Sequence, residues 1–117
     1  MSPPYKVQWT AGADEDLKNI VLFIAEESPQ SARAIFAKIK EQTSNLSHFP
    51  ERGRTVPELH DQGIFLYREL IISPWRIVYR IADNKVYIML VMDSRQNPED
   101  ILLKRFTRGA RLNPDGR

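Results

Sequence analysis

The sequence predicts an α+β domain in which a helical hairpin packs on a small, mainly antiparallel sheet. The first indication is a run of three β-rich segments, which we place at Ile64–Ile72, Trp75–Ala82 and Lys85–Asp93. Ser73-Pro74 and Asp83-Asn84 separate them, and links this short join antiparallel neighbours in a meander. The second indication is a pair of segments with apolar residues at helical spacing, which must bury those stripes on a sheet. The expected order of elements is therefore β-α-α-β-β-β-(α).

The chain is expected to open with a half-buried strand at Pro4–Thr10, because apolar and polar residues alternate there. Thr10 is placed as the N-cap of a first helix, and the acidic run Asp14–Asp16 suits the positive end of its dipole. We expect this helix to end near Glu27. Its apolar face consists of Leu17, Ile20, Val21, Ile24 and Ala25.

A second helix is expected to start at Ser28-Pro29, with Ser28 as N-cap and Pro29 in the first turn, and to end at Pro50. The short link makes the two helices an antiparallel hairpin. The apolar stripe of the second helix is Ala32, Ile35, Phe36, Ile39, Thr43, Leu46 and Phe49. Both stripes should pack on the third β-rich segment and on strand residues Ile77, Tyr79 and Ile81.

The third β-rich segment is apolar on both of its faces, which indicates a central strand. Simple alternation assigns Val86, Ile88, Leu90 and Met92 to one face and Tyr87, Met89 and Val91 to the other. We expect the strand Pro4–Thr10 to lie beside it. Of the remaining segments, Pro50–Gly63 is expected to be a polar loop, and Asn97–Phe106 a short helix. Residues 1–107 should form one domain, followed by a flexible basic tail at 108–117.

The composition argues against several classes of function. There is no cysteine and there are only two histidines, so neither thiol chemistry nor a histidine-rich metal site is expected. We find no catalytic triad, no phosphate-binding glycine loop and no metal-ligand spacing, and we predict no catalytic residues, no cofactor and no metal. No apolar run approaches the length of a membrane span, and a cytoplasmic protein is expected.

Several arginines are set into the predicted sheet. An arginine fork binds phosphate or carboxylate groups in a bidentate manner, which favours an acidic or polyanionic target. The candidate target-binding residues are Arg68, Arg76, Arg80 and Arg95. The alternative is that these side chains are structural and pair with Glu58, Glu69 or Asp93.

The two long helices can cover only one face of the sheet, which leaves the second face to be explained. We expect an apolar groove there, rimmed by Arg76, Arg80 and Arg95, and suited to an acidic amphipathic segment of a partner. The residues proposed to contact that partner are Val78, Tyr87, Met89, Val91, Ile101 and Leu102. The alternative is that the first strand and the C-terminal helix close this face completely.

Short motifs occur in order from Tyr5 to Arg105 and carry a family resemblance. They are Tyr5-x-Val7-x-Trp9-Thr10, Ala13-x-x-Asp16-Leu17-x-x-Ile20, Leu46-x-x-Phe49-Pro50-x-x-Gly53-Arg54, Tyr67-Arg68-Glu69-Leu70, Trp75–Ile81 and Val91–Arg95. With the element order, this set resembles the RelE/ParE superfamily of toxins from type II toxin–antitoxin systems, and the ParE-like branch, also called plasmid stabilisation proteins, more than the RelE-like one. The resemblance implies the RelE/ParE fold.

The two branches of that superfamily imply different activities. RelE-like toxins are ribosome-dependent mRNA endonucleases that use basic residues of the sheet and a tyrosine in the last helix. Three arginines of this sequence match basic positions of that set: Arg68, Arg76 and Arg95. Glu69 or Leu70 stands at the second basic position of its strand, and Asn97–Phe106 has no tyrosine. The nuclease set is incomplete.

The resemblance to the ParE-like branch implies a toxin that inhibits DNA gyrase and is not an enzyme. Its expected partners are gyrase and a cognate antitoxin, either ParD-like or another small DNA-binding protein, without membrane or direct nucleic-acid contact. An mRNA endonuclease and a non-toxic binding module with the same fold are the alternatives.

Overall fold

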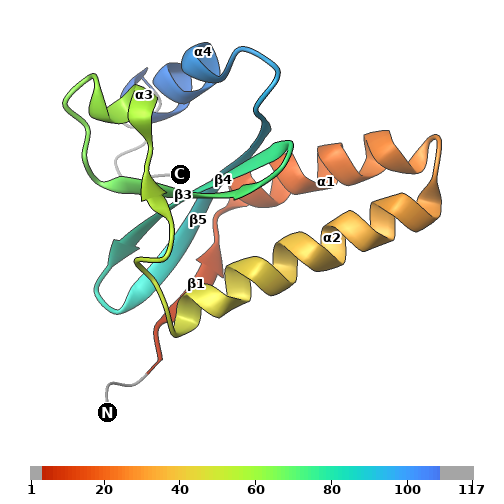
Figure 1. The fold of residues 1–117 in the computed structure, drawn as a ribbon, viewed down its shortest axis with the longest axis horizontal. Coiled ribbons are helices and arrows are strands. Elements are labelled where there is room, and N and C mark those ends of the chain that lie inside the picture. The colour runs from red at the N-terminus through yellow and green to blue at the C-terminus, as the bar shows by residue number, and fades with distance from the viewer. Residues whose placement is uncertain (1–3, 109–117) are drawn as a thin grey trace.

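The structure, a computed structural model, describes residues 4–108 and contains a sheet with helices on both of its faces (Figure 1). The predicted basic tail falls almost wholly on 109–117, outside the described residues. In chain order, the elements are β1 (Lys6–Trp9), α1 (Ala11–Ala25), α2 (Pro29–Ser44), a 3-10 turn η1 (Asn45–Ser47), β2 (Arg54–Thr55), α3 (Pro57–His60), β3 (Tyr67–Ile72), β4 (Trp75–Ala82), β5 (Lys85–Asp93), α4 (Pro98–Leu103) and a π-helical turn η2 (Lys104–Arg108).

The sheet has five strands in the order β1-β5-β4-β3-β2. The strands β3, β4 and β5 form the predicted antiparallel meander, and β1 joins it in parallel beside β5, with Lys6 opposite Lys85. The α+β fold, the element order and the position of β1 are therefore confirmed. The central position of β5 explains why this strand is apolar on both faces.

The turns of the meander follow from their sequences. Asp83 and Asn84 have φ angles of 54° and 64°, the left-handed conformation that a tight hairpin turn requires. The Ser73-Pro74 peptide bond is cis and lies in the β3–β4 turn. Helices α1 and α2 begin where capping predicts: the Thr10 hydroxyl accepts from the Ala13 amide, and the Ser28 hydroxyl accepts from the Ser31 amide.

The first core lies between the helical hairpin and one face of the sheet. Its buried members are Ala13, Leu17, Ile39, Leu46, Leu70, Ile72, Trp75, Ile77, Tyr79, Val86, Ile88 and Val91. Ile20, Ile24, Ile35 and Ile81 pack against it, as predicted. Phe36 and Phe49 do not, since they are 44% and 67% exposed. They stand at the solvent edge of the predicted α2 stripe, which is narrower than the sequence suggests.

A β-bulge interrupts the simple alternation predicted for β5. Val78 pairs with Leu90 and Tyr79 pairs with Ile88, so Met89 is an extra residue on β5. As a result, Met89 and Leu90 both face away from the helical hairpin, and Val91 faces toward it. The predicted face is therefore wrong for Leu90, Met92 and Val91.

A second core covers the opposite face of the sheet. Its buried residues come from β3–β5, α3, α4 and η2: Val56, Leu59, Tyr67, Val78, Met89, Leu90, Met92, Leu102 and Phe106. The rings of Tyr67 and Phe106 lie 4.4 Å apart, between their centroids. The segment Pro50–Gly63, predicted to be a polar loop, contains β2 and α3 and contributes Val56 and Leu59 to this core.

Candidate binding surfaces on the sheet

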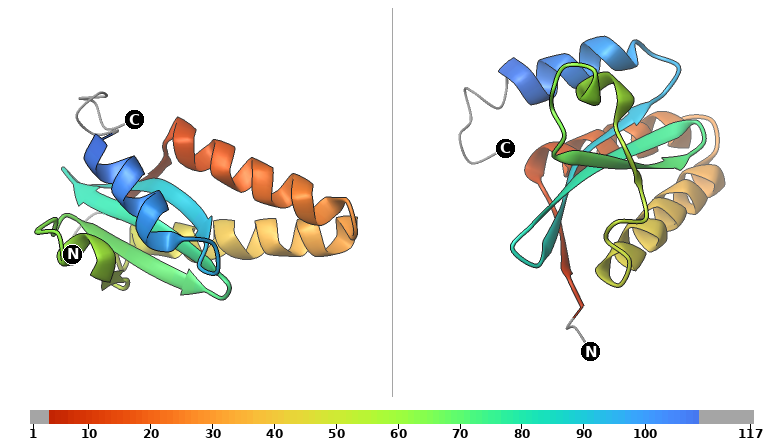
Figure 2. Two further views of the ribbon diagram at one scale, coloured as in Figure 1. Left: turned by 90° about the horizontal axis from the view of Figure 1, so that it is seen from above. Right: turned by 60° about the vertical axis from the view of Figure 1, so that its left-hand side comes forward.

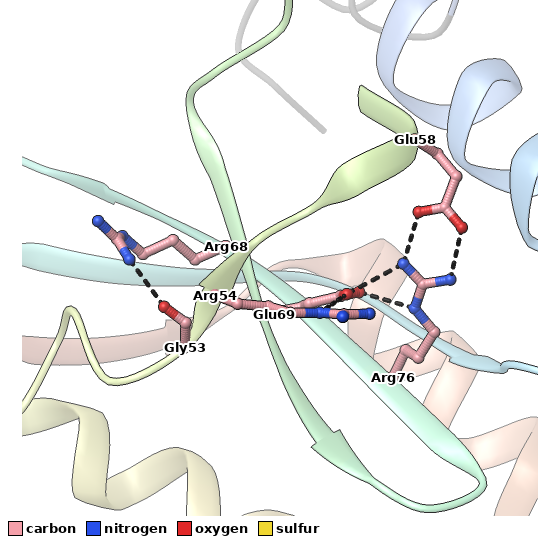
Figure 3. Close-up of polar contacts among 6 residues, drawn as sticks. All are labelled: Gly53, Arg54, Glu58, Arg68, Glu69 and Arg76. Atoms are coloured by element: carbon pink, nitrogen blue, oxygen red, sulfur yellow. Dashed lines mark hydrogen bonds and ion pairs between the residues drawn. The ribbon is translucent and has the colours of Figure 1, made fainter. Parts of the chain in front are cut away.

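The four candidate arginines do not form one cluster. Arg68 alternates with Leu70 on the side of the helical hairpin, whereas Arg76 and Arg80 alternate with Val78 on the second face. Figure 3 shows the Arg68 side chain directed away from that of Arg76. Arg95 lies between β5 and α4.

Arg76 is buried in an ion-pair network that we call the Arg76 cluster, formed by Arg54, Glu58, Glu69 and Arg76 (Figure 3). Its two terminal nitrogens donate to the two carboxylate oxygens of Glu58, at 2.8 and 2.7 Å. Its Nε donates to Oε1 of Glu69 at 2.7 Å, and Nη2 donates to Oε2 at 3.0 Å. Arg54 adds a bond of 2.8 Å from Nε to Glu69 Oε2. The contacts of Arg76 are therefore those of the alternative in which the arginines are structural and pair with nearby carboxylates.

The Arg76 cluster is neutral as a set and locks α3 to the sheet. The hydrogen bonds from Arg76 hold the pKa of Glu58 below its ordinary value, against the opposing effect of burial. The same bonds to Glu58, followed by those to Glu69, raise the pKa of Arg76, so its charge is permanent. Carboxylates occupy both donor edges of the guanidinium, one through Nε and Nη2 and the other through Nη1 and Nη2. Arg76 therefore offers no free pair of donors to an outside anion.

Arg68 and Tyr79 fix the loop that joins the helical hairpin to β2. Arg68 Nη1 donates to the Gly53 carbonyl at 2.7 Å, and the Tyr79 hydroxyl accepts from the Gly53 amide at 2.9 Å. The same hydroxyl donates to the Pro50 carbonyl at 2.7 Å, and burial raises the pKa of Tyr79. A Cβ on Gly53 would lie 2.5 Å from the Glu69 carbonyl oxygen, so only glycine fits there.

The remaining two arginines are accessible. The Arg95 side chain is 70% exposed and pairs with Asp93 at 2.8 Å, which lowers the pKa of that carboxyl. Arg80 is partly exposed and has no ion-pair partner among the residues that the structure describes. Contact between these arginines and a target stays a prediction.

The open apolar groove predicted on the second face is wrong for the isolated chain. Val78 and Leu102 are fully buried, Met89 is nearly so, and Ile101 and Tyr87 are only partly exposed. Elements α3, α4 and η2 cover this face, and the sequence analysis missed α3. Antitoxin contact with the residues of this set stays a prediction, and for the buried Val78, Met89 and Leu102 it requires these elements to move.

A different groove, which sequence reasoning missed, lies between α1 and α4 and follows the outer edge of β5. We call it the α1–α4 groove. Its apolar lining residues are Ile20, Phe23, Ile24, Trp75, Leu90, Val91, Met92 and Ile101. Phe23 is 72% exposed and has no apolar partner in either core of the described chain. The ion pairs Asp16–Arg105 and Asp93–Arg95 also line the groove.

The floor of the α1–α4 groove is a strand edge that polar side chains cap only in part. Strand β1 stops opposite Ile88, because the Thr10 amide and hydroxyl both donate to the Ile88 carbonyl and the chain then enters α1. Beyond that point, Asp16 Oδ2 accepts from the Val91 amide at 3.1 Å, and Arg105 Nη1 donates to the Met89 carbonyl at 3.1 Å. These two side chains, paired at 3.0 Å, occupy the place of a neighbouring strand.

The next backbone groups along that edge point into the groove. The Ser94 amide donates to the Pro74 carbonyl, so Trp75 and Asp93 form a non-hydrogen-bonded pair of the β4–β5 ladder. The amide of Asp93 and the carbonyl of Val91 are therefore directed away from β4. No bond to either group is found among the described residues. The sequence gives little signal for this edge, since it results from the early end of β1.

The structure offers little support for other kinds of site. Residues 4–108 contain no group of three or more histidine, aspartate and glutamate side chains placed to hold a metal ion. In the same part of the chain, no helix is long and apolar enough to cross a membrane.

Comparison with known proteins identifies the family. The profile of the family described as "ParE toxin of type II toxin-antitoxin system, parDE" matches residues 7–98. The chain is 29% identical over 99 residues to a protein of Sinorhizobium fredii strain NGR234 named "Putative toxin Y4kP", covering 83% of this chain and 96% of the relative.

Two solved structures share the fold. One is the chromosomal ParDE toxin–antitoxin system from P. aeruginosa, with a TM-score of 0.63 and 21% identity, covering 79% of this chain and 98% of the other. The second is the RelBE2 toxin–antitoxin complex from Mycobacterium tuberculosis, with a TM-score of 0.53 and 23% identity, covering 80% and 94%. From the family match over most of its length, the chain belongs to the ParE toxin family of type II toxin–antitoxin systems.

Proposed function

We propose that this toxin inhibits DNA gyrase and that a cognate antitoxin neutralises it. Gyrase is the target that membership of the ParE-like branch implies. The observation that carries the choice over mRNA cleavage is the Arg76 cluster, in which Glu58 and Glu69 occupy the guanidinium of Arg76. A nuclease of the RelE-like kind would need that arginine to meet RNA phosphate.

The other members of the nuclease set do not lie around one common site with Arg76, although Arg95 is accessible in the turn after β5. Arg68 lies on the helical-hairpin side of the sheet and is bound to the Gly53 carbonyl. Glu69, one of the two residues that can stand at the second basic position of this strand, is buried and carries a negative charge in place of a positive one. A single ring of cations around a scissile phosphate is therefore absent from the described residues.

The two activities are separated by assaying the purified protein against both targets. We expect it to block ATP-dependent supercoiling of relaxed plasmid by gyrase at a stoichiometric concentration. We expect no cleavage of mRNA on programmed ribosomes. Cleavage on the ribosome without any effect on gyrase would overturn the proposal, and inactivity in both assays would favour a non-toxic binding module.

The accessible arginine Arg95 offers a test of the target-facing surface. Arg95→Gln should weaken gyrase inhibition, because the side chain projects from the β5–α4 turn and Asp93 is its only ion-pair partner within residues 4–108. Arg33→Gln is the matched control, since Arg33 is an exposed residue on α2. Equal loss in both variants would show that Arg95 is no part of the contact surface.

We infer that the α1–α4 groove is where an antitoxin segment docks. An extended segment can pair its backbone with Val91 and Asp93, while its apolar side chains contact Phe23 and Ile101. Strand addition of this kind satisfies backbone groups that are otherwise left to water. The groove has charged residues of both signs, so the occupant should be an extended apolar segment rather than a strongly acidic one.

The neighbouring residues Phe23 and Leu22 provide a matched pair of variants. Both are exposed, at 72% and 55%, but only Phe23 lines the groove. Phe23→Ala should weaken antitoxin binding about tenfold or more in calorimetry, as expected for a buried aromatic anchor. Leu22→Ala should leave it unchanged. Equal affinities for the two variants would exclude the groove as the docking surface.

A further inference from the structure

The second face of the sheet carries a group of unneutralised cations at the end away from α4. We call it the basic sheet face and define it as Lys6, Arg80, Lys85 and Tyr87. It consists of residues from three adjacent strands, β1, β5 and β4. None of these residues belongs to the Arg76 cluster or lines the α1–α4 groove.

Strand register places these side chains together. Tyr87 packs on the margin of the second core, and Arg80 is its direct partner across the β4–β5 ladder. Lys85 is two residues before Tyr87 and so lies on the same face. Lys6 is the direct neighbour of Lys85 in the parallel β1–β5 ladder. Val7 and Val86 belong to the first core, which places Lys6 and Lys85 on the opposite face.

The arrangement has an electrostatic cost that the fold does not relieve. Like charges directly opposite each other on neighbouring strands destabilise a sheet. None of the five ion pairs found within the described residues involves Lys6, Arg80 or Lys85. The lysine of β1 is exposed, and the other two cations are partly exposed.

Among the described elements, the helices that cover the second face lie over its other end. Figure 2 shows α3 and α4 packed on one end of the sheet, while the β4–β5 hairpin extends away from them. The turn of that hairpin, Asp83-Asn84, adds a single acidic side chain near the cations.

We propose that the basic sheet face binds the phosphate backbone of DNA, with Tyr87 stacking against an unpaired base. This inference goes beyond gyrase inhibition and departs from the expectation that the toxin makes no direct contact with nucleic acid. Cations from adjacent strands follow a phosphate backbone, and an aromatic ring between them is a stacking platform for bases. A gyrase inhibitor with such a face would contact the DNA that gyrase holds as well as the enzyme.

The chemistry of the face favours nucleic acid over an acidic protein segment. A folded acidic segment would need apolar anchors beside its carboxylates. Within the described ladders, the accessible neutral side chains next to the cations are Gln8, Ala82 and the half-buried Tyr87, whereas Tyr67, which pairs with Arg80 on β3, and Val78 are buried. A flat, polar and positively charged surface with one aromatic ring matches a polynucleotide better.

The test measures binding of fluorescein-labelled oligonucleotides to the full-length protein by anisotropy, over a range of salt concentrations. For a duplex, three phosphate contacts predict that log K falls with log[salt] with a slope of about −2.7, from about 0.9 per contact. Neutralising one cation, as in Lys85→Gln, should reduce the magnitude of that slope by about 1. The double variant Lys6→Gln/Lys85→Gln should weaken binding by about tenfold at low salt.

The matched control is Lys18→Gln/Lys38→Gln, which makes the same change in net charge on exposed positions of α1 and α2. Equal loss of binding in the two double variants would show attraction by net charge alone and overturn the proposal, as would a lack of binding at low salt. Tyr87→Leu, which keeps an apolar contact with the second core, should weaken binding to a single strand more than to a duplex.

Two further outcomes separate this proposal from the others. If the Lys6/Lys85 variant loses affinity for the antitoxin but keeps its affinity for DNA, the face is a protein-docking surface and the proposal is wrong. Because oligonucleotide binding is measured without gyrase, a positive result stands even if the toxin fails to inhibit supercoiling. Failure of DNA binding likewise leaves the gyrase proposal intact.

Discussion

Glu69 is the residue on which the Arg76 cluster depends, because it accepts hydrogen bonds from two arginines and its side chain is fully buried. Glu69→Ala would leave Arg76 in a buried position with only Glu58 opposite. We expect this change to lower the free energy of unfolding by about 3–5 kcal/mol, as for other broken buried pairs. Chemical denaturation is the measurement.

The exposed pair Asp93–Arg95 supplies the control for this experiment. Asp93→Ala breaks an ion pair whose arginine is 70% exposed, and solvent screening should keep the loss of stability well below that of Glu69→Ala. A similar loss for the two alanine variants would mean that burial adds nothing to the Arg76 cluster.

Glu58 makes the stability of the protein depend on acid. Its pKa in the folded state lies below the ordinary value of 4.5, chiefly because Arg76 donates hydrogen bonds to it. The unfolded state therefore binds the proton more readily, so the contribution of Glu58 is complete above its unfolded pKa and is lost as pH falls through the folded pKa. We expect Glu58→Gln to be less stable at neutral pH and to lose less stability between pH 6 and about pH 3. Melts that decline in parallel for the two proteins would contradict this.

At the residue scale, the sequence identified the arginines and named Glu58, Glu69 and Asp93 as their alternative partners, but it did not decide which arginines pair with them and which stay accessible. Arg76 and Arg80 share a strand face, as alternation predicts, yet one is buried in carboxylates and the other is accessible. The difference arises from Glu58, which binds Arg76 from α3. Helix α3 has only four residues, too few to show a helical spacing of apolar residues in the sequence. Pairing over such a distance in the chain depends on tertiary structure, and local patterns do not encode it.

At the scale of elements, the helical stripes predict the first core with two exceptions, Phe36 and Phe49. Leu17 on α1 is buried at the sheet, whereas Phe36, assigned to the α2 stripe, is 44% exposed. We expect Leu17→Ala to cost about 2–5 kcal/mol through lost burial and the cavity that remains. Phe36→Ala should cost clearly less, although phenylalanine is the larger residue. Urea melts of the two variants provide the measurement, and the reverse order would place the core elsewhere.

Strand positions were predictable because β3 and β4 end at turn residues with distinct chemistry, Ser73-Pro74 and Asp83-Asn84. The bulge in β5 was not predictable. Met89 and Leu90 are both apolar, so the pairing with the bulge and the pairing without it both place apolar residues on the two faces of the strand. The α1–α4 groove was equally hidden. It exists because β1 stops opposite Ile88, and the length of a strand at a sheet edge is decided by where the chain must leave it.

At the scale of the whole molecule, the sheet separates two cores that are stabilised by different parts of the chain. The second core depends on Phe106, which stacks on Tyr67 and closes η2 over the sheet. Phe106→Ala should cost about 3–5 kcal/mol and expose the second face more than the first. In hydrogen exchange, we expect protection to fall in β3 and α3 and to persist in α1 and α2. Uniform loss of protection would show that the two cores unfold as one unit.

The parallel pairing of β1 with β5 also determines how late in synthesis the protein can fold. Thr10 bonds to Ile88, 78 residues further along the chain, and Asp16 meets Arg105 at a separation of 89. The helical hairpin leaves the ribosome first, with an apolar face that has no sheet to cover, and contacts this distant in sequence form slowly. Nascent chains that stop before Asp93 lack the central strand against which both cores assemble. A cell that makes this toxin is therefore exposed to the folded protein only after β5 has been synthesised, so an antitoxin already present can meet the protein as it folds.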